Sequence, residues 1–411
     1  MPLKPLKAVR SRVSISELTT IADRAQNMLI DLRKNLKECN LRKVAPAFSS
    51  GKVAKLCHIE RADLNYLCTR GRKDGYPVGT LSGESRSRMF TLAETQAFVR
   101  ANGRYQPRPS GQKGIVCAIG NFKADVGKTT CVVGLGQRLT LHGHKVLLID
   151  LDPQASSTML MGYAPDVDIC EEMTVMPFIY GEHQDLRYAV KPSYWDGLEL
   201  IPSCSALLSA DYHLAEKQAG NASFDSWAIL DTALKPLRDQ YDVILIDTPR
   251  TFSYLAIAAF IATDGLVVPL PPEALDFTSS TQFFRNLAEL FEQLNKNHKI
   301  EKNLAFIKIA LSKVNSSRAT TAIVNAWINK TYHAMVTAGA IIETDTAKNV
   351  NTEFQTLYDI EQYDGRQKKF DQLLESFDSF VADIEAAIQN TWQVRLAEDS
   401  AKNGSSLLSR M

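Results

Sequence analysis

The residues at 121–130 (NFKADVGKTT) have the types and spacing needed to hold a phosphate chain. Lys128 supplies a positive charge, the Thr129 hydroxyl completes the shell of a Mg²⁺ ion, and backbone N–H groups of such a loop cradle anionic oxygens. An apolar run at 115–119 precedes the loop, and a helix is predicted at 131–141. Because the N-terminus of a helix attracts anions, this strand–loop–helix order predicts a phosphate-binding site.

Two other apolar runs end in carboxylates that suit the same chemistry. One run ends at Asp150 and is followed by Asp152, and another ends at Asp247. Ligands of open α/β sheets bind at the carboxyl ends of the strands, so these three side chains are expected near the loop. Carboxylates there hold Mg²⁺ directly or through water, or position an attacking water. A helix cap would explain any one of these aspartates, but three beside Gly-Lys-Thr-Thr predict a nucleotide site.

Strands alternate with helices beyond residue 114, and this order predicts the fold class. The predicted strands are 115–119, 145–150, 198–202, 243–247, 266–269 and 304–309. Short runs of Val, Ile and Leu are typical of parallel strands that are buried on both faces. We therefore expect an α/β protein with a doubly wound, mostly parallel sheet of the P-loop NTPase type. An α-helical dimerisation segment and a winged helix-turn-helix domain are expected to precede it.

Charge is distributed unevenly along the chain. Residues 1–110 contain 21 Lys and Arg against 9 Asp and Glu, whereas the rest contains 26 against 37. A basic module at one end indicates an anionic partner, and nucleic acid is the leading candidate. A solvated basic surface explains the charge alone equally well.

Residues 16–39 are predicted to form an amphipathic helix. Its apolar residues recur at steps of three and four: Leu18, Ile21, Ala22, Ala25, Met28, Leu29, Leu32 and Leu36. Ser14 and Glu17 have the spacing of a capping box at its start. The apolar stripe needs a cover, either from its own domain or from a second subunit. We favour dimerisation through residues 1–45.

Residues 46–105 are predicted to form a winged helix-turn-helix domain. A helix at 51–57, the turn His58-Ile59-Glu60, a second helix at 61–70 and a basic loop follow one another. In this geometry the second helix directs Arg61, Asn65 and Tyr66 toward the major groove of DNA, and Arg86 and Arg88 of the loop meet phosphates. The alternative is a small helical scaffold without a ligand.

The remaining boundaries follow from composition. Residues 106–113 are a predicted linker, 114–395 the ATPase domain and 396–411 a flexible tail. The seven cysteines are scattered and lack a Cys-x-x-Cys pair, which favours reduced thiols in a cytoplasmic protein. No stretch approaches the ~18 apolar residues of a membrane span.

Three motifs together resemble those of the ParA/MinD family of deviant Walker A ATPases. They are Lys123 five residues before Lys128, the strand end DLDPQ at 150–154 and the strand end DTP at 247–249. Residues 114–390 resemble the ParA branch throughout, and the N-terminal domain is similar to that of the large (type Ia) plasmid ParA proteins, which repress their own operons.

The resemblance implies a division of roles within the site. ATP, or ADP after hydrolysis, binds with Mg²⁺ between two subunits of a homodimer. The nucleotide-binding set is Ala124, Asp125, Val126, Gly127, Lys128, Thr129 and Thr130. Lys128 acts in cis, Lys123 reaches the partner's phosphates, and Asp152 supports activation of the attacking water. Thr129 ligates Mg²⁺, and Asp247 binds it through water.

The resemblance also implies partners and a location. The ATP-bound dimer binds DNA without sequence preference, and a centromere-binding protein of the ParB kind stimulates hydrolysis and releases it. The N-terminal domain binds an operator. The protein is expected in the cytoplasm on the nucleoid, without a membrane partner. A basic run, Arg366, Lys368 and Lys369, is a candidate for the non-specific DNA contact or a solvated face. Lys313 and Asn315 are candidates for positions near the adenine.

Three positions, in two motifs, depart from the pattern of this family. Ala124 and Asp125 stand where the family has two glycines, and Arg250 stands where it has a second proline. Aspartate tolerates the left-handed backbone region, so the loop is still expected to form. Asp125 is expected to repel phosphate or to pair with Lys123 and withdraw it from the partner. We therefore expect nucleotide binding with weakened closure or hydrolysis, and Arg250 to contact either phosphate or a neighbouring acid.

Three functions other than a partition ATPase can be compared with the sequence. The first is an ATP-gated repressor with little or no hydrolysis. The second is a membrane-cycling ATPase of the MinD type, which requires a basic amphipathic helix at the C-terminus that residues 400–411 do not provide. The third is an iron–sulfur reductase of the nitrogenase type, for which Cys170 and Cys204 form no convincing pair.

Overall fold

The computed structural model describes residues 14–38, 43–70, 75–81, 83, 87–103, 106–221, 223–315, 318–342, 355–360 and 367–408. The chain divides into two compact units, Met1–Val44 and Ala45–Met411. Arg86 and Arg366, two of the predicted DNA contacts, lie outside the described residues.

The first unit contains one helix, α1 (Ile15–Glu38). Ser14 and Glu17 form the predicted capping box: the Ser14 backbone N donates to Glu17 Oε2 at 2.9 Å, and the Glu17 backbone N donates to Ser14 Oγ at 3.2 Å. Leu18, Ile21 and Met28 of the apolar stripe are 58%, 58% and 59% exposed in the single chain. This stripe is uncovered among the described residues.

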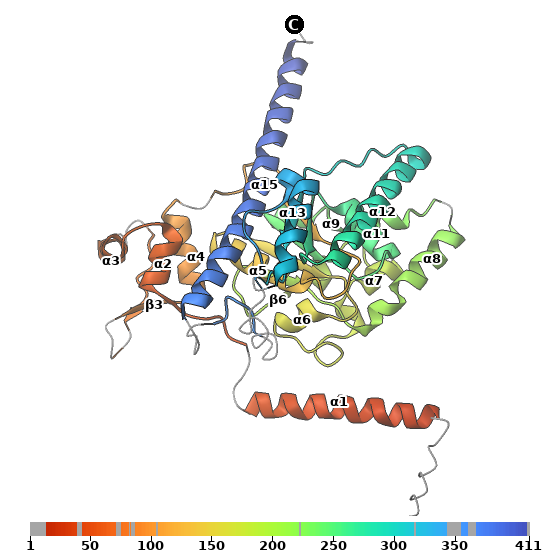
Figure 1. Ribbon diagram of the computed structural model, residues 1–411, viewed down its shortest axis with the longest axis horizontal. Helices are drawn as coiled ribbons and strands as arrows, with labels where there is room; N and C mark the ends of the chain where they lie inside the picture. The colour runs from red at the N-terminus through yellow and green to blue at the C-terminus, as the bar shows by residue number, and fades with distance from the viewer. Residues whose placement is uncertain are drawn as a thin grey trace, which may run out of the picture. The chain divides into compact units, whose positions relative to one another are not determined.

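A sheet of seven strands has the order β10-β9-β4-β8-β5-β7-β6. It lies in the middle of the second unit, surrounded by helices (Figure 1). The strands are β4 (Ile115–Ile119), β5 (Val146–Asp150), β6 (Lys191–Pro192), β7 (Leu198–Ile201), β8 (Val243–Asp247), β9 (Gly265–Leu270) and β10 (Phe306–Leu311). All neighbouring pairs are parallel except β6 with β7. The predicted fold class is thus confirmed. The two-residue strand β6 was missed because Lys191-Pro192 has no apolar pattern.

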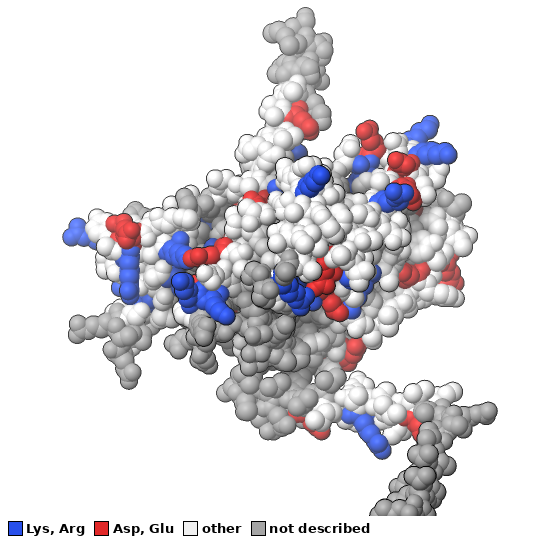
Figure 2. All heavy atoms as spheres, viewed as in Figure 1, with Lys and Arg blue, Asp and Glu red and all other residues white. Residues whose placement is uncertain are grey.

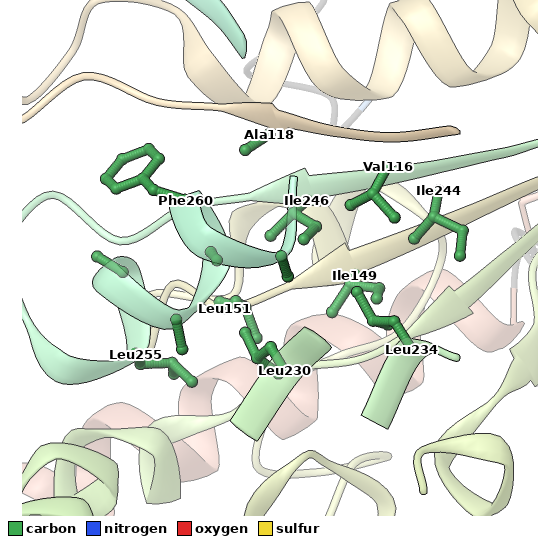
Figure 3. Close-up of a cluster of buried hydrophobic side chains, with 14 of the residues drawn as sticks. Val116, Ala118, Ile149, Leu151, Leu230, Leu234, Ile244, Ile246, Leu255 and Phe260 are labelled. Carbon is green, nitrogen blue, oxygen red and sulfur yellow. The ribbon is translucent and has the colours of Figure 1, made fainter. Parts of the chain in front are cut away.

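Helices cover both faces of this sheet, as the continuous burial of its central strands requires. They are α5 (Lys128–Leu141), α6 (Ser156–Leu160), α7 (Met176–Tyr180), α8 (Ala210–Gly220), α9 (Ile229–Leu234), α10 (Leu237–Gln240), α11 (Tyr254–Ala262), α12 (Ala274–His298), α13 (Ala319–Tyr332) and α15 (Gln367–Leu408). Val116 and Ala118 of β4 belong to one core with α8, α9 and α11 (Figure 3). Ile115, Cys117 and Ile119 belong to the other, with α5 and α15.

The long helix α15 fixes α5, the helix that begins at the phosphate loop. At Gly134 of α5 an added Cβ would lie 2.5 Å from Phe377 Cζ, so only glycine permits this close packing. At the end of α5, His142 Nδ1 and His144 Nε2 lie 2.7 and 2.8 Å from the two carboxylate oxygens of Glu385 in α15. Contacts at the middle of α5 and just beyond its C-terminal end therefore hold this helix in place behind the site.

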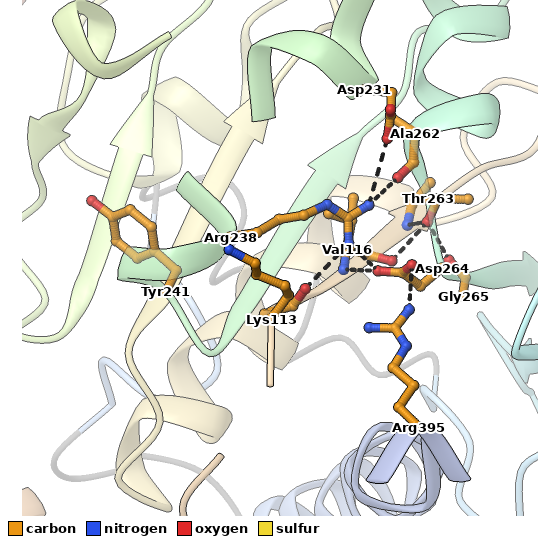
Figure 4. A network of polar contacts seen from close by, with 12 residues as sticks. Lys113, Val116, Asp231, Arg238, Tyr241, Ala262, Thr263, Asp264, Gly265 and Arg395 are labelled. Carbon is orange, nitrogen blue, oxygen red and sulfur yellow. Dashed lines mark hydrogen bonds and ion pairs between the residues drawn. The ribbon is translucent and has the colours of Figure 1, made fainter. Parts of the chain in front are cut away.

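A polar network anchors α15 at the amino-terminal edge of the sheet (Figure 4). The Asp264 carboxylate accepts hydrogen bonds from the Val116 backbone N at 2.8 Å, Arg238 Nη1 at 2.5 Å and Arg395 Nη2 at 2.7 Å. The helix continues to Leu408, so the flexible tail predicted from residue 396 is wrong. Residues 395–400 are mostly good helix formers, and Gln112 Nε2 donates to Asp399 at 2.9 Å.

The N-terminal part of the second unit has three helices and a small antiparallel sheet. The helices are α2 (Ser50–Cys57), α3 (Arg61–Arg70) and α4 (Leu92–Ala101), and the strands β1 (Phe48–Ser49), β2 (Thr80–Leu81) and β3 (Arg88–Phe90) pair in the order β1-β3-β2. His58, with φ 54°, ends α2 and turns the chain into α3. The order of helix, turn and helix is as predicted, but the strands β1, β2 and β3 were not predicted.

This module packs directly on the ATPase part. Gln96 Nε2 of α4 donates to the Asp196 backbone O at 2.7 Å, and Lys55 of α2 pairs with Glu375 of α15 at 3.2 Å. Arg108, in the predicted linker, donates to the carbonyls of Arg238 and Tyr241 at 2.7 Å each. The domain boundaries themselves stay a prediction.

Among the described helices, none has the length and apolar character that crossing a membrane requires.

Candidate functional site

A cavity of about 310 Å³ lies at the carboxyl ends of the central strands, beside the N-terminus of α5. Its lining residues are Asp125, Val126, Gly127, Lys128, Thr129, Thr130, Asp152, Ser156, Met159, Leu160, Arg250 and Lys313. Six of the seven predicted nucleotide-binding residues are in this set, together with Asp152. Ala124, the seventh, is exposed next to Asp125.

The loop before α5 keeps the backbone form that a phosphate cradle needs. Gly127 has φ 88° and Asp125 has φ 58°, in the left-handed region that aspartate tolerates. Ser312 Oγ donates to the Val126 backbone O at 2.7 Å and fastens the loop to the end of β10. The predicted survival of the loop shape despite Ala124 and Asp125 therefore agrees with the geometry.

Lys128 is buried at the start of α5, with 7% of its surface exposed. Its Nζ donates to the backbone carbonyls of Asn121 at 3.0 Å and Lys123 at 3.3 Å. Burial lowers the pKa of Lys128, and the nearby carboxylates of Asp247 and Asp152 oppose that shift. Among the described residues the hydrogen-bond partners of this ammonium are neutral carbonyls, so it is well prepared to accept an anion.

Thr129, which lines the cavity, contacts Asp247, which is buried and does not line it. Thr129 Oγ1 and Ser157 Oγ donate to Asp247 Oδ2 at 3.1 and 2.6 Å. The other oxygen, Oδ1, is buried without a hydrogen-bond partner in the described structure. Burial raises the pKa of Asp247 to about 6. A buried carboxylate oxygen without a partner, next to a hydroxyl, fits the donor set of Mg²⁺, which prefers oxygen ligands together with water and phosphate.

Within the described residues no three His, Cys, Asp or Glu side chains form a metal-binding group on their own.

Asp150 and Asp152 have different surroundings although both follow β5. Asp150 is fully buried and accepts hydrogen bonds from Thr158 N at 2.9 Å, Thr158 Oγ1 at 2.7 Å and Asp152 N at 3.1 Å. It therefore holds the loop after β5 and does not line the cavity. Asp152 does line it, and its Oδ2 lies 3.6 Å from Arg250 Nε. Of the two partners predicted for Arg250, the structure shows the neighbouring acid.

Lys123 lies away from the cavity lining and is paired with an unexpected residue. Its Nζ is 2.8 Å from Oδ1 of Asp276, in the first turn of α12. The predicted alternative, a pair between Lys123 and Asp125, is therefore wrong. Asp276 was not predicted as the partner of Lys123 because the two residues are more than 150 positions apart. The one signal in the sequence that could have indicated Asp276 is that it is an acidic residue at the start of a helix that follows a strand end.

The predicted DNA-binding residues are partly engaged within the N-terminal module. Asn65 and Arg61 are exposed on α3, and Arg61 Nε donates to Ser50 Oγ at 3.2 Å. Arg88 is half-buried and donates to the Val78 backbone O within the small sheet. Lys and Arg side chains gather over the part of the surface that carries α2 and α3 (Figure 2). Lys368 and Lys369 are exposed at the start of α15.

Comparison with known proteins gives a consistent assignment. A family model described as an AAA domain matches residues 114–300. Protein SopA of Escherichia coli (strain K12) is 34% identical over 322 residues, which cover 77% of this chain and 82% of SopA. Plasmid partition protein A of Escherichia coli is 24% identical over 296 residues, covering 68% and 74% of the two chains.

The solved structure of a partition protein supports the same fold. It is 20% identical, has a TM-score of 0.60 and covers 86% of this chain and 99% of its own. At this sequence identity the structural similarity supports only the fold. Membership of the family is shown by the similarity to SopA. The chain belongs to the ParA/MinD family of P-loop ATPases, in the branch that contains the plasmid partition proteins.

Proposed function

We propose that this protein is a partition ATPase that binds ATP with Mg²⁺ as a homodimer and segregates plasmid or chromosomal DNA. The observation that carries the proposal is the cavity at the N-terminus of α5, where buried Lys128 adjoins the Thr129–Asp247 pair. A cation, a hydroxyl and a carboxylate oxygen without a partner form the set that a Mg²⁺-triphosphate requires.

Several residues in and near the cavity have a proposed part in nucleotide binding. Lys128 and the backbone N–H groups of the loop bind phosphate, Thr129 ligates Mg²⁺, and Asp247 holds it through water. When bound, Mg²⁺ neutralises charge on the phosphates. Asp152, at the cavity wall, orients the attacking water. Lys123 serves the partner subunit once it leaves Asp276.

The N-terminal module is proposed to bind operator DNA and to repress the protein's own operon. Arg61 and Asn65 are exposed on α3, the second helix of the helix-turn-helix, which is the position of a recognition helix. Arg86 and Arg88 are proposed phosphate contacts, but Arg88 must first leave the Val78 carbonyl. The uncovered apolar stripe of α1 supports dimerisation, which suits a two-fold symmetric operator.

In the ATP state the dimer is proposed to bind DNA without sequence preference and to occupy the nucleoid in the cytoplasm. A ParB-like centromere-binding protein stimulates slow hydrolysis and releases it. A second candidate function is an ATP-gated repressor with little turnover. The observation that favours it is the Asp125 carboxylate at the cavity wall, where it opposes a polyphosphate.

Steady-state ATP turnover with Mg²⁺ and non-specific duplex DNA distinguishes the two functions. The matched control is Lys128→Ala, which removes the buried ammonium. Turnover above that control supports the ATPase. Turnover equal to the control, with nucleotide binding retained and DNA and a ParB-like partner both supplied, contradicts the ATPase and favours the gated repressor.

A further inference from the structure

Two of the three departures from the family pattern, Asp125 and Arg250, line the same cavity although they are 125 residues apart. They carry opposite charges, and both act on Lys128: Asp125 favours its charged form and Arg250 disfavours it. The cavity therefore has an extra negative and an extra positive group, and the two offset each other around the same ammonium.

Asp125 is held in a position where it acts on a bound anion. Its backbone has φ 58° in the phosphate loop, and its side chain is exposed to the cavity. Among the described residues it forms no ion pair. A carboxylate so placed, unneutralised, repels a polyphosphate, and the repulsion grows with the number of phosphates.

Arg250 is positioned to neutralise that charge. Its backbone follows Thr248, which is fixed to the end of β4 because Thr248 Oγ1 donates to the Ile119 backbone O at 2.8 Å. The guanidinium itself is loosely held: its side chain is 43% exposed, and Nε lies 3.6 Å from Asp152 Oδ2, beyond hydrogen-bond distance. Because the backbone of Arg250 is fixed while its guanidinium is loosely held, the side chain can turn from Asp152 to a phosphate.

We propose that Arg250 is a phosphate-binding residue of this chain: its guanidinium leaves Asp152 and contacts the terminal phosphate of ATP, offsetting the charge of Asp125. The planar guanidinium matches phosphate oxygens in a bidentate manner, which a single contact to Asp152 does not use. The inference rests on the proposed function in requiring ATP at this cavity. It also gives Asp152 two states, paired with Arg250 before ATP binds and free to orient water afterwards.

Nucleotide binding, measured by isothermal titration calorimetry, tests this proposal without any need for turnover. The probes are ATPγS and ADP, each with Mg²⁺, and the proteins are the wild type, Arg250→Gln, Arg250→Lys, Asp125→Gly and the double variant Asp125→Gly/Arg250→Gln. The control is Arg187→Gln, which removes an arginine paired with Asp185 at 2.7 Å outside the cavity. Thermal unfolding of every variant verifies the fold.

Loss of a charged contact to the terminal phosphate weakens ATPγS binding roughly ten-fold in Arg250→Gln and changes ADP binding by less than about three-fold. Arg250→Lys, which keeps the charge, falls between the wild type and Arg250→Gln. The double variant restores the cavity's net charge and returns ATPγS affinity to within about three-fold of the wild type. Arg187→Gln leaves both affinities unchanged.

Equal losses for ATPγS and ADP, or no change in Arg250→Gln, overturn the proposal while leaving the ATPase function intact. A wild-type protein that binds neither nucleotide defeats the proposed function and this inference together. A wild type that binds ATPγS but never hydrolyses ATP defeats the ATPase proposal alone.

Discussion

Replacing Asp247 by asparagine is expected to stabilise the nucleotide-free protein at neutral and alkaline pH, although it removes a carboxylate from the site. The side chain is 1% exposed, and its Oδ1 has no hydrogen-bond partner in the described structure. Burial raises the pKa of Asp247 from 3.8 to about 6, so its charged form is disfavoured in the folded state.

The magnitude follows from this shift. A change from 3.8 to about 6 corresponds to about 3 kcal/mol, at about 1.36 kcal/mol per pKa unit. The folded carboxyl keeps its proton to a higher pH than the unfolded one. The wild type therefore loses stability as the pH rises from about 4 to about 6, and does not recover it above that range. Asparagine does not ionise and therefore avoids this loss. Its amide N, however, takes the position of Oδ1, where no acceptor lies nearby, and this unsatisfied donor costs about 1–2 kcal/mol. The expected net gain near pH 8 is about 1–2 kcal/mol.

Urea unfolding of the nucleotide-free protein at about pH 8, 6 and 4 measures this effect. The unfolding free energy of Asp247→Asn is expected to be higher than that of the wild type at the highest pH. At the lowest pH this difference is expected to disappear. Adding Mg²⁺ and ATP is expected to stabilise the wild type but not the variant. Asp196→Asn, which changes an exposed carboxylate outside the cavity, is the control. A variant less stable than the wild type at about pH 8, or an advantage that does not change with pH, would refute the reasoning.

Three further changes test other parts of the structure. Asp276→Asn breaks the pair with Lys123, whose side chain is 35% exposed, and is expected to lower the unfolding free energy by about 1 kcal/mol in urea; an unchanged midpoint would contradict a stabilising pair. Burial raises the pKa of Glu385, but the hydrogen bonds of two histidines outweigh it and lower the pKa below 4.5. Glu385→Gln is therefore expected to cost about 2–3 kcal/mol near pH 7, with the difference shrinking as the pH falls below about 4.5; a difference independent of pH would refute it. Leu18→Glu with Ile21→Glu is expected to weaken dimerisation of the nucleotide-free chain in analytical ultracentrifugation; an unchanged dimer would refute a role of α1 in the interface.

The sequence alone determined the features that depend on neighbouring residues. The strand before the phosphate loop and the helices α2, α3 and α5 lie close to their predicted positions, since apolar periodicity and helix caps are local signals. The motif at 121–130 predicted the cavity lined by Lys128 and Thr129, because a strand–loop–helix sequence carries its own geometry. Residue types and their spacing were thus enough to predict a site for phosphate and Mg²⁺.

Tertiary structure decided which distant side chains meet. The pairs Lys123–Asp276 and Arg250–Asp152 join segments about 150 and 100 residues apart, and the order of the strands sets those distances. The helix that continues to Leu408 depends on contacts with the sheet, such as that between Arg395 and Asp264. Periodicity reports which face of an element is buried, but not which element covers it. The partner of each charge in the site therefore became known only once the chain was folded.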